Sequence, residues 1–231
     1  MYPSDKWTEQ ELQKLEKQLT DVYKQAEKEL DDKARNYFKQ FSRRYAKEYA
    51  AYQAGKYTKK EFEAWLMNQY GRGRRWEVLR EDMARRLTES NQIAAAYINE
   101  KTPLVIALNH NFEAYMIKSL VSDRQMKEIG DIAFNLVDEH TVKRLTVKKQ
   151  KILPPRRVLK SKDVRWNKKK LQNALLQGVL QGDSIGKLAG RFQDVTGMNH
   201  TAAIRNARTA FTGAQNGGRQ HMRKPTRWEL M

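Results

Sequence analysis

Apolar side chains recur at alternating spacings of three and four residues near the start of the chain, and this pattern restricts the segment to a helix. The repeat consists of Leu12, Leu15, Leu19, Val22 and Ala26. Such spacing places every apolar side chain on one face of an α-helix, as in the seam of a coiled coil. Thr8 and Glu11 form the pattern of a capping box, which predicts that the helix begins at Thr8. The segment is therefore predicted to be a coiled-coil-like arm.

The stripe continues with aromatic residues up to about Gln53. These residues are Tyr37, Phe38, Phe41, Tyr45, Tyr49 and Tyr52. The continuation predicts one helix from about Thr8 to about Gln53, roughly 70 Å long at a rise of about 1.5 Å per residue. Aromatic residues at helical spacing are more often core than a platform for stacking nucleobases, so we expect these residues to form core.

Helical periodicity dominates the rest of the chain as well. Helices are predicted at residues 58–70, 76–98, 103–120, 122–145, 168–181 and 185–193, and from residue 199 onward. The start signals for four of these helices are the capping box of Thr58 and Glu61, Pro103, and the caps Asn167 and Asn199. Alternation typical of a strand occurs only at residues 145–149. The predicted fold is all-α and elongated, with a coiled-coil-like N-terminal helical arm and a compact C-terminal helical unit.

Positive charge is concentrated in the C-terminal part of the chain. Residues 143–231 carry 21 Lys and Arg side chains and four acidic ones, whereas residues 1–142 are nearly neutral. Within residues 143–170 there are 13 basic side chains and one acidic one. We therefore divide the chain into a helical arm and middle region (1–145), a basic Pro-containing linker (146–166) and a basic helical unit (167–231).

Lysine and arginine side chains at this density repel one another unless an anion neutralises them. The long polyanion that usually does so is nucleic acid. The residues expected to contact phosphates are Lys148, Lys149, Lys151, Arg156, Arg157, Lys160, Lys162, Arg165, Lys168, Lys169 and Lys170. In the alternative interpretation, this block is a solvated basic loop that only keeps the protein in solution. The first 32 residues carry nine acids against five bases, which suggests different partners for the two ends of the chain.

The sequence contains no pattern that points to catalysis. Cysteine is absent, which excludes disulfides, thiol catalysis and cysteine-based metal sites. The four histidines lie far apart and lack the spacing of metal ligands. A nuclease-like metal site would require folding to bring Asp163, Asp183 and Asp194 together. We therefore expect no enzyme activity, no cofactor and no metal. A membrane is not an expected partner, because no apolar run reaches the roughly 20 residues of a spanning helix.

Residues 199–219 combine small side chains on one helical face with arginines and amides elsewhere. The small residues spaced for close helix packing are Ala207, Ala210 and Ala214. Arginines such as Arg205 and Arg208 can bind phosphates with two parallel hydrogen bonds. In the alternative interpretation, these two arginines pair with Asp183 or Asp194 inside the protein.

The same segment resembles the signature of the phage minor head protein family, also called head morphogenesis or Mu F-like minor capsid proteins. The resemblance is carried by residues 203–210, Gly213-Ala214-Gln215-Asn216 and Gly218-Arg219, and it extends back to Val164. It implies that the family signature comprises Arg205, Asn206, Arg208, Thr209, Gln215, Asn216 and Arg219. It also implies a virion component in the capsid interior or at the portal vertex, assembled in the host cytoplasm and without enzyme activity. Family members continue further, so we expect this chain to be truncated at its C-terminus or to be a degenerate member.

Two functional hypotheses follow from these features. In the first, the chain is a phage minor capsid protein that acts in head assembly or DNA ejection. Its partners are the portal or major capsid protein and double-stranded DNA of any sequence, and it self-associates through its N-terminal helix. In the second, residues 171–179, 183–192 and 199 onward form a helix-turn-helix regulator that presents Arg205, Asn206 and Arg208 to the major groove. A regulator would prefer its own site by about 10³-fold or more, whereas a packaging protein would hardly discriminate.

Overall fold

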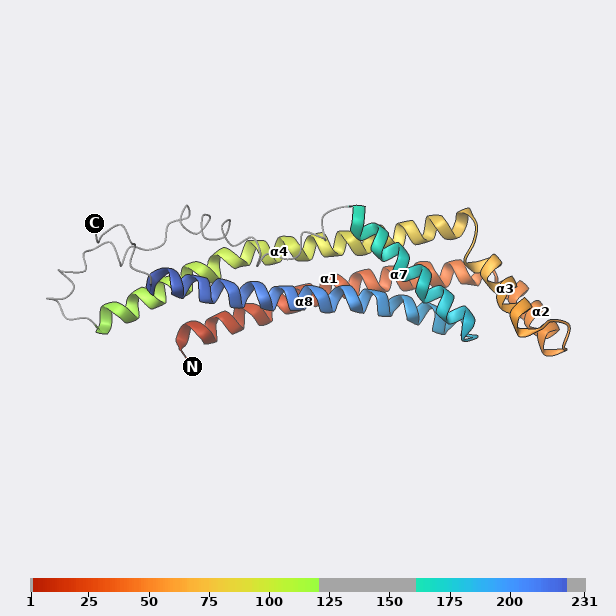
Figure 1. The fold of residues 1–231 in the computed structure, drawn as a ribbon, viewed down its shortest axis with the longest axis horizontal. Helices are drawn as coiled ribbons and strands as arrows, with labels where there is room; N and C mark the ends of the chain where they lie inside the picture. Colours follow the sequence, from red (N-terminus) through yellow and green to blue (C-terminus); the bar gives the residue numbers. More distant parts are fainter. Residues whose placement is uncertain (1, 121–160, 224–231) are drawn as a thin grey trace. The chain divides into compact units, whose positions relative to one another are not determined.

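The computed structural model describes residues 2–120 and 161–223, and the regular elements in these residues are all α-helices (Figure 1). They are α1 (Pro3–Lys39), α2 (Ser42–Gln53), α3 (Lys59–Tyr70), α4 (Arg74–Leu120), α7 (Ser161–Leu180) and α8 (Ile185–Arg223). The predicted all-α fold is confirmed for this part of the chain. The helix predicted at 122–145 and the strand predicted at 145–149 lie outside the described residues. None of the described helices has an apolar stretch long enough to cross a membrane.

The chain divides into two compact units, and each unit combines segments from distant parts of the sequence. The first unit comprises Met1–Gln18, Ala94–Arg156 and Ala203–Met231, and the second comprises Leu19–Ile93 and Arg157–Ala202. Helices α1, α4 and α8 therefore each contribute to both units. The three consecutive regions expected from the sequence differ from this division, because the units form through contacts between segments far apart in the chain.

In the second unit, aromatic side chains from several helices form the centre of the core. Phe38 of α1 and Trp76 of α4 stack on Phe192 of α8, with ring centroids 6.1 Å and 6.0 Å apart. Tyr70 of α3 meets Phe38 edge-on at 5.3 Å. The indole N–H of Trp76 donates to the side-chain oxygen of Gln172 in α7 at 2.6 Å, so its polar atom has a partner. Helix α7 also adds apolar side chains to this core.

The aromatic stripe predicted as core belongs to this unit. Tyr37 and Phe38 are buried. The residues partly buried against the core are Phe41, Tyr45 and Tyr52. Tyr49 is 41% exposed. The prediction of core is therefore confirmed for the stripe except at Tyr49.

In the first unit, small side chains allow α8 to pack closely against α4. Ala207, Ala210 and Ala214 are buried, as their spacing predicts. Gly218 marks the closest approach, because a Cβ atom there would lie 2.5 Å from the carbonyl oxygen of Ile106 in α4. The small-residue face of α8 is therefore a packing surface.

The predicted continuous helix from Thr8 to Gln53 is wrong, because a turn at Gln40 and Phe41 separates α1 from α2. The backbone N–H of Phe41 donates to the carbonyl of Phe38 at 3.0 Å, which is the tighter spacing of a 3₁₀ turn. After this turn, the aromatic side chains of α2 pack against α3. The aromatic side chains of α2, Tyr45 and Tyr52, thus reach α3 because the helix is interrupted at Gln40 and Phe41. Helical periodicity alone does not predict this interruption.

Helix α1 begins at Pro3 rather than at the predicted cap Thr8. Proline suits the first position because it lacks the N–H that would have no partner there. Thr8 lies inside the helix, and its hydroxyl donates to the carbonyl of Ser4 at 2.7 Å. By contrast, the capping box of Thr58 and Glu61 is confirmed. In this box, each side chain accepts a hydrogen bond from the other residue's backbone N–H, at 3.3 Å and 2.8 Å.

The predicted helix start at Pro103 is wrong, since Pro103 lies inside the continuous helix α4. A proline inside a helix removes one hydrogen bond and costs about 3 kcal/mol. Ile98 before it and Val105 after it are both 1% exposed. Burial of a side chain of this size contributes about 1.5–3 kcal/mol. Burial on both sides of Pro103 therefore offsets the cost of the proline.

The predicted boundary between α7 and α8 is confirmed. Gly182 has a φ of +68°, in the left-handed region that favours glycine. The backbone N–H of Asp183 donates to the carbonyl of Gly178 at 2.9 Å and closes the end of α7. At the start of α8, the hydroxyl oxygen of Ser184 accepts from the backbone N–H of Lys187 at 3.4 Å.

The predictions of Asn167 and Asn199 as helix caps are wrong. Helix α7 begins at Ser161, so Asn167 lies within it, and α8 is continuous through Gly197 and Asn199. Asn167 is fully buried and Asn199 is 6% exposed. Val195 and Ala203 on either side of Asn199 are buried, as is Leu171 one turn after Asn167, so tertiary packing maintains helices that local signals would end.

Candidate nucleic-acid interface

The cations predicted to contact nucleic acid fall partly outside the described residues. Lys148, Lys149, Lys151, Arg156, Arg157 and Lys160 lie outside them, and Lys162 lies on α7. The structure places the remaining four, Arg165, Lys168, Lys169 and Lys170, on the N-terminal half of α7. The surroundings of these four side chains therefore determine which of them can reach a phosphate.

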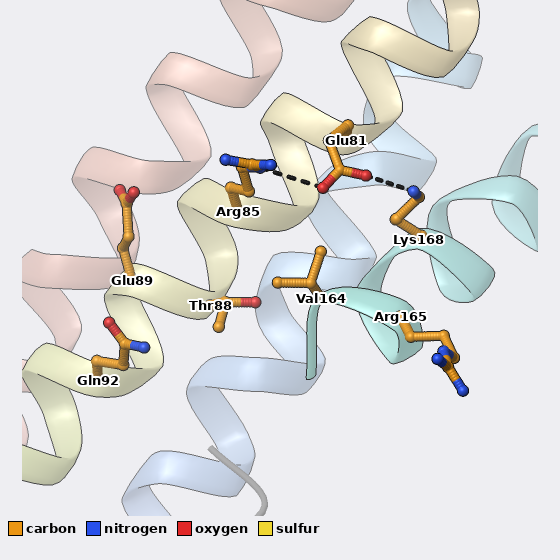
Figure 2. Close-up of a pocket in the computed structure, with 8 residues that line it drawn as sticks. All are labelled: Glu81, Arg85, Thr88, Glu89, Gln92, Val164, Arg165 and Lys168. Atoms are coloured by element: carbon orange, nitrogen blue, oxygen red, sulfur yellow. Dashed lines mark hydrogen bonds and ion pairs between the residues drawn. The ribbon is translucent and has the colours of Figure 1, made fainter. Parts of the chain in front are cut away.

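Lys168 already has an acidic partner in the second unit. Its ammonium group pairs with one carboxylate oxygen of Glu81 in α4, and the other oxygen accepts from Arg85 at 3.1 Å (Figure 2). The pKa of Glu81 lies below its usual range, chiefly because Lys168 donates a hydrogen bond to it and because Arg85 donates a second one. Lys168 therefore links α7 to α4 rather than facing solvent with an unpaired charge.

An open cleft of about 570 Å³ lies at this ion-pair set. It is lined by Glu81, Arg85, Thr88, Glu89, Gln92, Val164, Arg165 and Lys168. Figure 2 shows Arg165 pointing away from the carboxylate of Glu81. An anion that enters the cleft must compete with the carboxylate of Glu81 to bind Lys168 or Arg85. Arg165 is exposed to solvent, so an anion meets no such competition there. Arg165 is thus the cation of this cleft that a phosphate reaches without breaking an ion pair.

The solvent face of α7 carries cations beside an exposed indole. Arg165 and Lys169 are exposed, and no ion pair involving them is found among the described residues. Trp166 is 42% exposed, and the ammonium nitrogen of Lys170 lies 5.3 Å from the centre of its ring. A cation over an indole contributes about 0.5–1 kcal/mol at an exposed site. This face, defined by Arg165, Trp166, Lys169 and Lys170, is called the α7 basic face below.

The lowered pKa of Glu81 predicts an acid-sensitive contact between α7 and α4. Because the pKa is lower in the folded chain than the ordinary value of 4.5, the ion pairs stabilise the fold above pH 4.5. This contribution is lost as the pH falls through the folded-state pKa. We expect Glu81→Gln to be less stable than the wild type at pH 7 and to approach it as the pH is lowered from 4.5 through the folded-state pKa of Glu81.

Urea unfolding followed by circular dichroism at each pH measures this difference. Glu89→Gln, in the same cleft but outside the ion-pair set, is the control and should follow the wild type. A stability difference between Glu81→Gln and the wild type that stays constant over this pH range would contradict the expected role of Glu81.

Arginines of the signature segment contact acidic residues of α1 in the first unit. Arg208 donates from Nε to one oxygen of Glu16 at 2.6 Å and from Nη2 to the other at 3.3 Å. Arg219 pairs with Asp5, and the side-chain amide of Gln215 donates to the same carboxylate. The bidentate geometry that suits a phosphate is therefore taken up at Arg208 by a carboxylate of the chain itself.

The predicted pairing of Arg205 and Arg208 with Asp183 or Asp194 is wrong. Arg208 pairs with Glu16, and Asp183 pairs with Arg191. Arg205 and Asp194 are both exposed. The described side chains contain no group of three histidine or acidic residues that could hold a metal ion.

The other signature residues have mixed surroundings. The hydroxyl of Thr209 donates to the carbonyl of Arg205 at 2.9 Å, within α8. Asn206 is partly buried and Asn216 is exposed. The signature therefore combines contacts inside the first unit with polar side chains that face solvent.

The described residues lack one structural element that the helix-turn-helix hypothesis requires. That motif requires a turn between Phe192 and Asn199, where α8 is an uninterrupted helix. Ala207 and Phe211 are also buried, at 0% and 1% exposure, on the segment that would enter the major groove. The face of this segment that carries Ala207 and Phe211 therefore cannot contact DNA bases, whereas Arg205 and Arg208 are exposed.

Sequence reasoning missed a polar network inside the second unit. The amide of Asn199 donates to the oxygen of Asn167 at 3.1 Å, and its own oxygen accepts from Asn91 at 2.8 Å. Asn167 in turn donates to Thr88 at 3.2 Å, and Tyr23 donates to Asn91. Burial raises the pKa of Tyr23 above its usual range, so its hydroxyl keeps the proton that it donates. This network joins α1, α4, α7 and α8.

A signal for the network is present in the sequence. Asn199 lies four residues from both Val195 and Ala203, and Asn167 lies four residues before Leu171. Both asparagines therefore occupy positions of an apolar helical stripe. A polar residue at such a position predicts a buried hydrogen bond as well as a helix cap.

Comparisons of the sequence with protein-family models and with curated proteins, and of the fold with solved structures, find no match. Function is therefore inferred from the residues and their geometry. Among the described cations predicted to contact nucleic acid, those of the α7 basic face are the ones that a polyanion can reach without displacing a carboxylate.

Proposed function

We propose that the chain is a non-enzymatic phage minor head protein that binds double-stranded DNA without sequence preference during head assembly or DNA ejection. The observation that carries the DNA-binding part is the ratio of 21 basic to four acidic side chains in residues 143–231. The exposed Arg165 and Lys169 on α7 support it. The head-protein part rests on the resemblance of residues 164–219 to that family.

The protein partners in this proposal are the portal or the major capsid protein, and the location is the virion. Exposed acids along α1, namely Glu9, Asp21 and Asp32, support a docking role for this helix. Leu15 and Leu19 are buried, so self-association through α1 has to use its exposed side chains. Immunoblotting of purified, nuclease-treated phage particles tests the location.

Neutralising the basic Pro-containing linker (residues 146–166) is expected to weaken binding by the same factor for every DNA sequence. The test variant replaces Lys148, Lys149, Lys151, Arg156, Arg157, Lys160, Lys162 and Arg165 with glutamine in the full chain. Fluorescence anisotropy of random-sequence duplexes across a salt series measures the affinity. The plot of log affinity against log salt has a slope of about −0.9 per neutralised phosphate, so the variant should show a much shallower slope.

A second variant controls for net charge alone. It replaces eight exposed lysines elsewhere with glutamine: Lys17, Lys24, Lys28, Lys47, Lys56, Lys59, Lys60 and Lys118. It carries the same total charge as the test variant but should retain most of the affinity and of the salt slope. Equal losses of affinity in the two variants would show that DNA binding depends on the net charge of the protein rather than on the basic Pro-containing linker. A tight preference for one duplex sequence would contradict the packaging role.

A further inference from the structure

We propose that Trp166 is a stacking site for unpaired nucleobases, so that the α7 basic face binds single-stranded nucleic acid through bases as well as phosphates. This inference rests on the proposed nucleic-acid binding and names a substrate class for the same surface. Trp166 is 42% exposed, although its ring is one of the largest apolar groups in the chain. Trp76, by comparison, is buried in the core with 1% exposure.

The neighbours of Trp166 supply the charge that a nucleic-acid backbone requires. Lys169 and Lys170 follow it by three and four residues, so helical geometry places them beside the ring. The ammonium nitrogen of Lys170 lies 5.3 Å from the ring centre. Arg165 precedes it and is exposed. A phosphate held by these cations brings its base next to the indole.

The carboxylate of α4 that pairs with α7, that of Glu81, is already neutralised. Glu81 accepts from Lys168 and from Arg85. Lys168 therefore compensates the carboxylate, while Arg165 and Lys169 remain available to phosphates. The described charged side chains that face solvent beside Trp166, namely Arg165, Lys169 and Lys170, are consequently positive.

Two other exposed aromatic residues, Tyr2 and Tyr57, lie in different surroundings. Tyr2 has the guanidinium of Arg219 over its ring at 5.7 Å, and that arginine pairs with Asp5. The pKa of Tyr57 is raised chiefly by its hydrogen bond to the carboxylate of Glu48. The carboxylate of Glu48 repels a nucleic-acid backbone next to Tyr57, and the cation next to Tyr2 is already paired. Trp166 combines a larger ring with an environment of cations.

Base stacking on an aromatic side chain distinguishes single strands from duplexes. An unpaired base can lay its face on the indole, and each such contact changes affinity by about 5- to 150-fold. In a duplex, the bases are already stacked and paired, and extruding one is unfavourable. The same cations contact the phosphates of both substrates. Loss of the ring should therefore affect single strands selectively.

The test compares three labelled probes by fluorescence anisotropy with the full chain: a 20-mer of thymidine, an abasic 20-mer with the same backbone, and a 20-base-pair duplex. We expect Trp166→Ala to weaken thymidine 20-mer binding about tenfold and duplex binding less than twofold. Wild-type protein should bind the abasic strand about as weakly as Trp166→Ala binds the thymidine strand. Trp166→Phe should retain most of the affinity because it keeps an aromatic face.

Tyr115→Ala is the matched control, since Tyr115 is an aromatic residue with 67% exposure on α4. It should leave all three affinities unchanged, and unchanged thermal unfolding midpoints should show that each variant is folded. Equal binding of the thymidine and abasic strands, or an unchanged thymidine affinity in Trp166→Ala, overturns base stacking while the proposed function survives through duplex binding. Absence of binding to every probe at low salt overturns both.

Discussion

Replacement of Asn199 by alanine is expected to lower the free energy of unfolding by about 4 kcal/mol. The side chain accepts from Asn91 at 2.8 Å and donates to Asn167 at 3.1 Å and to the carbonyl of Val195 at 2.9 Å. Alanine removes these bonds and leaves the amides of Asn91 and Asn167 without this partner inside the second unit. A buried polar group that loses its partner costs about 1–3 kcal/mol.

Urea unfolding measures this loss against a matched control on the same helix. Asn216 is exposed on α8, and Asn216→Ala should change the free energy of unfolding by less than about 0.5 kcal/mol. A double-mutant cycle with Asn167→Ala should show a coupling energy of about 0.5–3 kcal/mol, because the two amides contact each other. A loss below about 1 kcal/mol for Asn199→Ala would mean that water replaces the missing amide.

The buried network also bears on the register of the helices. A polar residue at an apolar position stabilises the one alignment in which its hydrogen bonds form, as a buried asparagine does in a coiled coil. We therefore expect Asn91, Asn167 and Asn199 to fix the alignment of α4, α7 and α8 in the second unit.

Features that depend on neighbouring residues were predictable from the sequence. The capping box of Thr58 and Glu61 and the boundary at Gly182 and Ser184 are confirmed, because their hydrogen bonds join residues a few positions apart. The buried face at Ala207 is likewise set by helical spacing. Local patterns therefore predicted the helices and most of their apolar faces.

Features that depend on distant residues were not predictable. Asn167, Asn199 and Pro103 carry local signals for a helix start, but burial against other helices overrides these signals. The positive charge of α7 was predicted, whereas the pairing of Lys168 with Glu81 was not, because the two residues are 87 positions apart. Charge composition thus predicted a candidate interface without showing which of its cations the fold neutralises.

Replacement of Gly218 by alanine is expected to destabilise the chain by about 2 kcal/mol, opposite in sign to the usual effect of this change in a helix. Alanine normally stabilises a helix interior by about 0.5–1 kcal/mol relative to glycine. At Gly218, the added Cβ would lie 2.5 Å from the carbonyl oxygen of Ile106 and 3.0 Å from the backbone nitrogen of His110. Both atoms belong to the backbone of α4, so relief of the clash requires movement of a helix.

Gly197→Ala is the matched control on the same helix, because a Cβ atom there meets nothing within 4 Å. It should raise the free energy of unfolding by up to about 1 kcal/mol, and urea unfolding of both variants measures the difference in sign. Stabilisation by both substitutions would contradict the close approach of α8 to α4. Changes of opposite sign in the free energy of unfolding would instead show that Gly218 is required for helix packing in the first unit. This glycine of the signature would then serve packing rather than contact with a ligand.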